Sequence, residues 1–216
     1  NSVVRRINHN RPEYYTLQKP VDGSTVRSFT DASGMVTTRT RSGSELVTQD
    51  PTMTRTESYS GDPRFGVQTQ YLAELYYEPY TTIDYEVSTV REATLANPSD
   101  PLSLETLTHS RSVNGQTWQW HWDTASMTAT LTSPELRTSS QTLGDDGEVI
   151  SSQQGTLAPW AYGYDERGRL TSAVRGDRSY GIEYGVDGFV SAMIDPLEQR
   201  TELVYDDAGR LTQLTH

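Results

Sequence analysis

Hydrophobic and polar residues alternate along several short stretches in the second half of the chain. Trp118, Trp120 and Trp122 are separated by Gln119 and His121, and the same period of two recurs further along. Successive side chains of a β-strand point to opposite faces of a sheet, so alternating residues share one face. We therefore predict an aromatic ladder across neighbouring strands, formed by Trp118, Trp120, Trp122, Trp160, Tyr162, Tyr164, Tyr180, Tyr184 and Tyr205. The returning strands are expected to carry weaker aliphatic positions in the same phase, at Leu170, Val174, Val190, Ala192 and Ile194.

Turn signals recur in the same region at a nearly constant interval. Four glycines are separated by 21, 20 and 21 residues: Gly147, Gly168, Gly188 and Gly209. Two of them end an Asp-x-x-Gly unit, in which the carboxylate accepts backbone N–H groups and the glycine adopts a left-handed conformation. A type I turn followed by such a residue joins antiparallel strands through a bulge. The predicted turn residues are Asp31, Gly34, Asp123, Ser126, Gly147, Asp165, Gly168, Gly188, Asp206 and Gly209.

One copy departs from this rule. Ser126 stands where the glycine is expected, and a left-handed serine should cost about 1 kcal/mol.

A second series of turn signals lies between the first, at Asn114-Gly115, Pro134, Gly155, Gly176 and Pro196. Together the two series place a turn every 8 to 13 residues, which is typical of strand-turn-strand architecture. Each repeat of about 20–21 residues is then one hairpin. The predicted fold class is all-β, made of antiparallel β-hairpin repeats.

The first half of the chain lacks this period. Residues 61–66 read as an irregular loop rich in Pro and Gly, 72–77 as a short helix or a strand, and 81–92 as a strand. We therefore divide the chain into a degenerate β region at 1–110, in the same sheet or leading into it, and a hairpin array at 111–216.

Composition restricts the class of protein. Hydrophobic residues make up 33% of the chain, below the usual 45–50%, which argues against a thick core. A net charge of −11 disfavours nucleic acid as a partner. Cysteine is absent, which excludes disulfides and thiolate metal sites, and no apolar run has the roughly 18–20 residues of a membrane helix. The chain starts at Asn1 without Met or signal peptide, and we expect it to be an internal part of a longer polypeptide.

Two segments carry a family resemblance. Tyr164-Asp165-x-x-Gly168-Arg169-Leu170 and Tyr205-Asp206-x-x-Gly209-Arg210-Leu211 resemble the YD-repeat, or rearrangement-hot-spot (Rhs), family. Asp195-Pro196-Leu197, followed by Arg200-Thr201, is similar to the segment between turns in that family, with Glu198-Gln199 in place of the expected glycine. The resemblance covers about residues 112–216.

The resemblance implies a long antiparallel sheet that is curved into a spiral and forms a hollow shell. Such shells commonly enclose a C-terminal toxin or belong to large secreted or cell-surface proteins, and teneurins carry a related barrel. The family's self-cleavage core, with its extended Asp-Pro-x-Gly-Leu signature, is not visible in this sequence, so self-cleavage is not assigned.

Several side chains suggest binding chemistry, and each also has a structural explanation. The tryptophan stripe either stacks on sugars or fills an apolar sheet face, and the second is favoured because the sheet is short of apolar residues. Arg175-Gly176-Asp177 spells an adhesive tripeptide at a predicted hairpin tip, where a turn also requires glycine. Acidic pairs such as Asp145-Asp146 and Asp206-Asp207 offer oxygens to Ca²⁺, but turn chemistry explains them better.

The charged and catalytic residue types form no recognisable catalytic pattern. No pair has metal-ligand spacing among the scattered histidines His9, His109, His121 and His216. We expect no enzyme activity and no cofactor or metal. Five arginines could form an anion-binding track, but pairing with carboxylates of adjacent hairpins, which would fix strand register, is favoured: Arg137, Arg169, Arg178, Arg200 and Arg210.

The predicted function is structural. We expect a YD-repeat module of a large secreted or cell-surface bacterial protein, which encloses or displays a C-terminal toxin or effector. The alternatives are a self-assembling extracellular filament, tube or matrix component, and an adhesin that binds glycan or receptor. The expected partners are neighbouring repeats of the same polypeptide, identical subunits or an enclosed toxin domain, with no nucleic acid and no membrane span.

Overall fold

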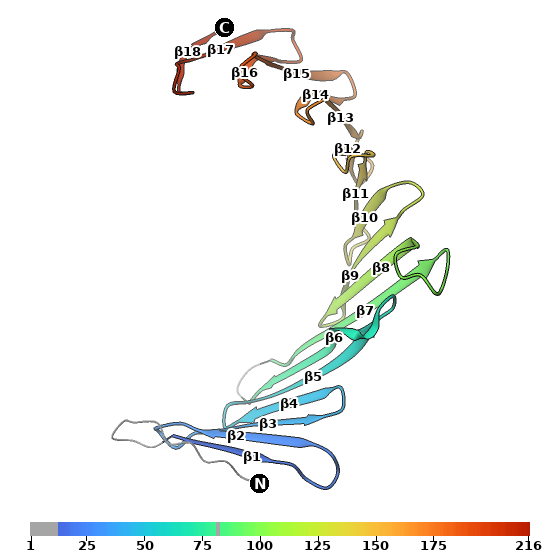
Figure 1. Ribbon diagram of the computed structural model, residues 1–216, viewed down its shortest axis with the longest axis vertical. Helices are drawn as coiled ribbons and strands as arrows, with labels where there is room; N and C mark the ends of the chain where they lie inside the picture. Colours follow the sequence, from blue (N-terminus) through green and yellow to red (C-terminus); the bar gives the residue numbers. More distant parts are fainter. Residues whose placement is uncertain (1–12, 81–82) are drawn as a thin grey trace. The chain divides into compact units, whose positions relative to one another are not determined.

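The computed structural model describes residues 13–80 and 83–216, and this part of the chain forms eighteen strands and no helix (Figure 1). The chain divides into two compact units, Asn1–Gln119 and Trp120–His216. Within each unit, consecutive strands pair in antiparallel orientation. The predicted all-β class of antiparallel hairpins is confirmed. Residues 1–12, including His9, and 81–82 lie outside the described residues.

The first unit contains the longest strands of the described chain. Its strands are β1 (Tyr14–Gln18), β2 (Thr25–Thr30), β3 (Val36–Ser42), β4 (Glu45–Asp50), β5 (Met53–Asp62), β6 (Gly66–Pro79), β7 (Tyr85–Leu95) and β8 (Leu104–Val113). The segment 72–77, for which helix and strand were both open, lies within β6. The strand expected at 81–92 corresponds to β7. Strand β9 (Gln116–Asp123) contains residues of both units.

The second unit is a regular up-and-down meander. It continues from β9 with β10 (Thr128–Thr132), β11 (Thr138–Leu143), β12 (Val149–Gln154), β13 (Trp160–Tyr164), β14 (Leu170–Arg175), β15 (Arg178–Tyr184), β16 (Val190–Ile194), β17 (Arg200–Tyr205) and β18 (Leu211–Thr215). The register shifts by one residue at the end of β11, β13, β15 and β17, immediately before each glycine turn. These four equivalent bulges are the geometry expected for a type I turn followed by a left-handed residue.

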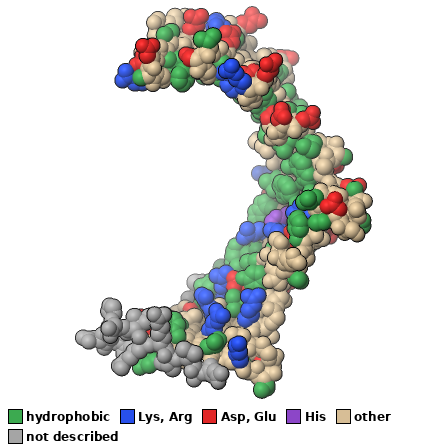
Figure 2. All heavy atoms as spheres, in the orientation of Figure 1, with side chains coloured by type: hydrophobic (Ala, Val, Ile, Leu, Met, Phe, Trp, Pro, Cys, Tyr) green, Lys and Arg blue, Asp and Glu red, His purple; other side chains and the backbone are tan. Residues whose placement is uncertain are grey.

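Burial is sparse throughout the described residues. Among residues 13–80 and 83–216, only Val87 and Ala192 are buried hydrophobic residues, and no large side chain is fully buried. Figure 2 shows hydrophobic side chains exposed on the visible face, among polar and charged ones. Backbone pairing and contacts between cross-strand neighbours must therefore supply much of the stability of each sheet.

The predicted phase of the aliphatic positions is confirmed at Leu170 and Val190, which pair with Tyr164 and Tyr184. It is wrong at Val174, Ala192 and Ile194. Tyr162 pairs with Ala173, which pairs with Tyr180, so these three share a face, whereas Val174 pairs with Ala161 and lies on the other. Ala192 and Ile194 likewise pair with Glu183 and Gly181, not with the aromatic positions of β15. The reason is the number of residues in the connection between two strands. When that number pairs an even-numbered residue with an odd-numbered one, the even-numbered positions of the two strands lie on opposite faces of the sheet.

Candidate functional site

The most distinctive local structure is a five-residue turn with a fixed set of hydrogen bonds. At Asp165, the backbone N–H donates to the Arg169 carbonyl (3.0 Å), and the Gly168 N–H donates to the Asp165 carbonyl (2.9 Å). The Arg169 N–H donates to Asp165 Oδ1 (3.0 Å), and Gly168 has φ +73°. The same three bonds, at 2.8–3.0 Å, recur in the turns that begin at Asp31 and Asp206.

An arginine reinforces two of these turns. Arg169 Nε and a terminal guanidinium nitrogen both lie within 2.8 Å of Asp165 Oδ2, and Arg210 makes the same contacts with Asp206 Oδ2. The Arg169 side chain and then its backbone N–H lower the pKa of Asp165. For Asp206 the backbone N–H of Arg210 is the larger influence, and its side chain adds to the lowering of the pKa. The expectation that these arginines pair with adjacent hairpins is wrong, because their carboxylates belong to their own turns.

Two other copies of the turn lack the leading carboxylate. Gly144 and Gly185 begin turns with the same two backbone bonds, and Gly147 and Gly188 have φ values of +85° and +90°. At the second of these turns Asp187 Oδ1 accepts the Phe189 N–H instead (3.1 Å). A Cβ at Gly185 would lie 2.6 Å from that oxygen, which explains the extra glycine.

In the turn that follows β9, the left-handed residue is not the one predicted. Met127, and not Ser126, has positive φ (+49°), and its N–H donates to the Thr124 carbonyl (3.3 Å). The prediction for Ser126 is wrong because Asp123 still belongs to β9, so the turn begins one residue later. Asp123 Oδ1 instead accepts the Ser126 N–H (3.1 Å).

The turns predicted at Pro134 and Pro196 are present, and they are further copies of this turn, although their likeness to the glycine turns was not predicted. Turns that begin at Ser133 and Asp195 have the same backbone bonds, with Leu136 (φ +62°) and Glu198 (φ +63°) in the left-handed position. The available signal was Ser-Pro or Asp-Pro at their first two positions, because proline favours the second position of a type I turn.

The tyrosine before two of the turns connects one hairpin to the previous one. The Tyr164 hydroxyl donates to the Val149 carbonyl (2.8 Å), and the Tyr184 hydroxyl donates to the Leu170 carbonyl (2.9 Å). Each tyrosine ends a strand, and each acceptor begins the strand that follows the preceding glycine turn. The hydroxyl therefore ties the entry to one turn to the exit from the turn before it.

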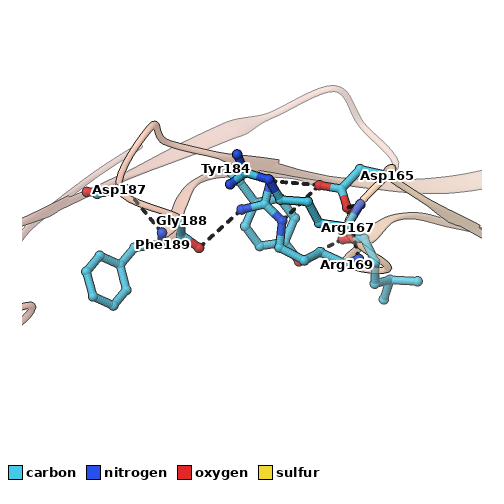
Figure 3. Close-up of polar contacts among 8 residues, drawn as sticks. Asp165, Arg167, Arg169, Tyr184, Asp187, Gly188 and Phe189 are labelled. Carbon is cyan, nitrogen blue, oxygen red and sulfur yellow. Dashed lines mark hydrogen bonds and ion pairs between the residues drawn. The ribbon is translucent and has the colours of Figure 1, made fainter.

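The residue after the turn glycine contacts the next tyrosine as well. The Arg169 guanidinium lies 4.1 Å from the centre of the Tyr184 ring, and Nη1 donates to the Gly188 carbonyl (3.4 Å). Figure 3 shows Arg169 between Asp165 and Tyr184, with the Phe189 ring directed away from them. Phe189 stacks on Tyr205 in the following hairpin, with ring centres 5.1 Å apart. We name this combination of turn, following residue and next tyrosine the hairpin junction.

The remaining aromatic residues do not form one continuous ladder. Trp160 contacts Tyr162 and Tyr180 at ring-centre distances of 6.4 and 5.9 Å. Trp122 Nε1 donates to Thr124 Oγ1 (3.0 Å), whereas Trp118 and Trp120 are 41% and 36% exposed. The structure therefore separates a cluster on a sheet face from the tyrosines Tyr164, Tyr184 and Tyr205 near the turns.

The adhesive tripeptide occupies a tight hairpin between β14 and β15. Gly176 has φ +56°, and Asp177 is exposed. Arg175 Nε donates to the Ala158 carbonyl (3.1 Å), and its guanidinium lies 5.7 Å from the centre of a Trp160 ring. The arginine is thus engaged with the sheet and does not project with Asp177.

Arg200 does bridge neighbouring hairpins, as the sequence suggested. Its guanidinium donates to both carboxylate oxygens of Glu183 (2.6 and 2.8 Å) and lies 3.3 Å from Glu202. The Arg200 side chain is the main reason why the pKa of Glu183 is lowered.

The described part of the chain contains neither a clustered metal site nor a membrane-spanning helix. Residues 13–80 and 83–216 contain no cluster of three or more His, Asp or Glu side chains arranged to hold a metal. Within the same residues no helix is long and apolar enough to cross a membrane.

Comparisons with known proteins give no family assignment. No protein-family model matches the chain, and a search of curated proteins finds no significant relative.

Proposed function

We propose that the chain is a structural module of the YD-repeat type within a large secreted or cell-surface bacterial protein. In this proposal the module forms part of a wall that encloses or displays a C-terminal toxin or effector. The hairpin junction is the observation that carries the proposal. Its Asp, Arg and Tyr side chains are consumed in contacts with the backbone and with each other, which suits a wall better than a reaction centre.

The resemblance to YD repeats and the junction geometry support each other. The aspartate, glycine and arginine that carry the resemblance form the turn at Asp165, and the tyrosine of the junction is Tyr184 of the next hairpin. The proposal assigns the module no catalytic step, no metal and no cofactor.

The test is electron microscopy and limited proteolysis of the full-length polypeptide that contains this chain. We expect discrete hollow particles and a C-terminal segment that resists protease until the particle is denatured. A C-terminal segment cleaved as fast in the native protein as in denaturant would contradict enclosure.

A further inference from the structure

One face of the second unit carries a hollow beside an exposed tryptophan. Trp120 lines it together with Ala129 and Leu131 of β10, and its volume is about 350 Å³. Ser139 and Gln141 of β11 and Ser152 and Gln154 of β12 also line this hollow. A smaller hollow of about 70 Å³ shares Ser152 and Gln154 and is bounded by Trp160 and Arg175.

Strand register makes these lining residues one continuous surface. Ser139 pairs with both Leu131 and Gln154, and Gln141 pairs with both Ala129 and Ser152. Ser152 in turn pairs with Trp160. Residues opposite each other in antiparallel strands share a face, so a floor of hydroxyls and amides extends from β10 to Trp160. We name this surface, from Trp120 to Trp160, the tryptophan groove.

The groove combines an aromatic wall with unused polar groups. Trp120 is 36% exposed, so its indole is not consumed in a core. The described part of the chain provides no hydrogen-bond partner for the side-chain amides of Gln141 and Gln154, and both residues are exposed. Each amide both donates and accepts hydrogen bonds. The Ser152 hydroxyl is already paired with the Tyr162 hydroxyl (3.0 Å).

The lining indicates a neutral ligand rich in hydroxyl groups. No charged side chain lines the larger hollow, so ionic ligands gain no ion pair there. A purely apolar ligand would cover the amides of Gln141 and Gln154 without replacing their hydrogen bonds to water. A sugar ring satisfies both demands, since one face presents C–H groups to an indole and its edge presents hydroxyls to amides.

We propose that the tryptophan groove binds a neutral glycan chain. Trp120 stacks on one sugar ring, Gln141 and Gln154 bond the hydroxyls of the chain, and Trp160 bounds the far end. This binding role goes beyond a purely structural wall and does not depend on it.

The test is titration of the whole chain with neutral hexasaccharides of glucose, N-acetylglucosamine, mannose and galactose, followed by tryptophan fluorescence and calorimetry. We expect at least one of the four to bind. Trp120→Ala should weaken that binding by about tenfold or more, and Gln141→Ala combined with Gln154→Ala should weaken it by about tenfold. Trp118→Ala and Gln213→Ala, which change residues outside both hollows, should leave it unchanged.

The exposed glutamines keep the test independent of folding. If circular dichroism shows that Trp120→Ala is unfolded, the double glutamine variant decides the outcome. Absence of binding to all four hexasaccharides overturns the proposal, and so does binding that the glutamine variant leaves unchanged. Binding of heparin in place of the neutral sugars overturns it as well.

Discussion

The two units use the same three residue types in different ways. In the second unit, Asp165 and Arg169 are four residues apart in one turn, and Tyr184 of the next hairpin covers the arginine. In the first unit, Asp62 lies 3.5 Å from both Arg64 and Arg91, although Arg91 is 29 residues away in the sequence. Local pairing can be copied from hairpin to hairpin, whereas distant pairing is made once.

The cluster in the first unit is also the more buried. Asp62 is 5% exposed and accepts the Arg64 N–H at 2.9 Å. Burial alone would raise the pKa of Asp62, but the Arg64 N–H and the charges of Arg64 and Arg91 outweigh it and lower the pKa. Arg91 lies over the Tyr71 ring at 4.6 Å, and its N–H donates to the Tyr71 hydroxyl. The Asp62 carboxylate therefore connects β5, the following loop and β7. Its removal should destabilise all three segments.

The largest effect is expected at Asp62. Asp62→Ala leaves Arg64 and Arg91 without their shared carboxylate and should lower the free energy of unfolding by about 2–3 kcal/mol. Urea unfolding measures the change, and hydrogen exchange should show faster exchange in β5 to β7. Glu105→Ala, an exposed carboxylate on β8, is the control and should change stability little. Equal effects of the two substitutions would remove the contrast between the units.

The next effect separates two glycines of the repeated turn. Gly168→Ala forces alanine into a left-handed conformation in open space and should cost about 1 kcal/mol. Gly209→Ala has the same backbone cost, and its Cβ would lie 2.8 Å from Phe189 Cζ, so it should cost more. Thermal unfolding of the two variants checks the order. The reverse order would show that Phe189 does not hold the junction to Tyr205.

A smaller effect distinguishes the two arginines. The Arg169 side chain is 28% exposed beneath Tyr184, whereas that of Arg210 is 79% exposed. Arg169→Ala should therefore destabilise the chain by about 0.5–1 kcal/mol more than Arg210→Ala, because only Arg169 loses a ring contact. Urea midpoints of both variants provide the measurement, and identical midpoints would count against the junction.

The smallest effect concerns pH. The pKa values of Asp165 and Asp206 lie below their ordinary value of 3.8, so both groups add stability above that pH and lose it as the pH falls through their folded-state pKa. Asp165→Asn combined with Asp206→Asn should reduce stability at neutral pH and flatten its decline below about pH 4. Thermal unfolding between pH 2 and 7 tests this. Parallel curves for the variant and the native chain would show that the turn carboxylates contribute nothing through ionisation.

Features that depend on near neighbours could be predicted from the amino-acid sequence. The glycine period and the Asp165 turn could be predicted because their hydrogen bonds span at most four residues. The turn predicted at Pro196 has the same local cause, because its Asp195-Pro196 start is a turn signal even though Glu198 replaces glycine.

Contacts between residues of different strands could not be predicted, because they depend on how the folded strands align. The face occupied by Val174 depends on how many residues each connection contains, and a change of one residue reverses it. The surface shared by Trp120, Gln141 and Gln154 and the pairing of Asp62 with Arg91 depend in the same way on strands aligned over long stretches of chain. Periodicity reports the direction of a side chain along its own strand, whereas register between strands fixes what that side chain touches.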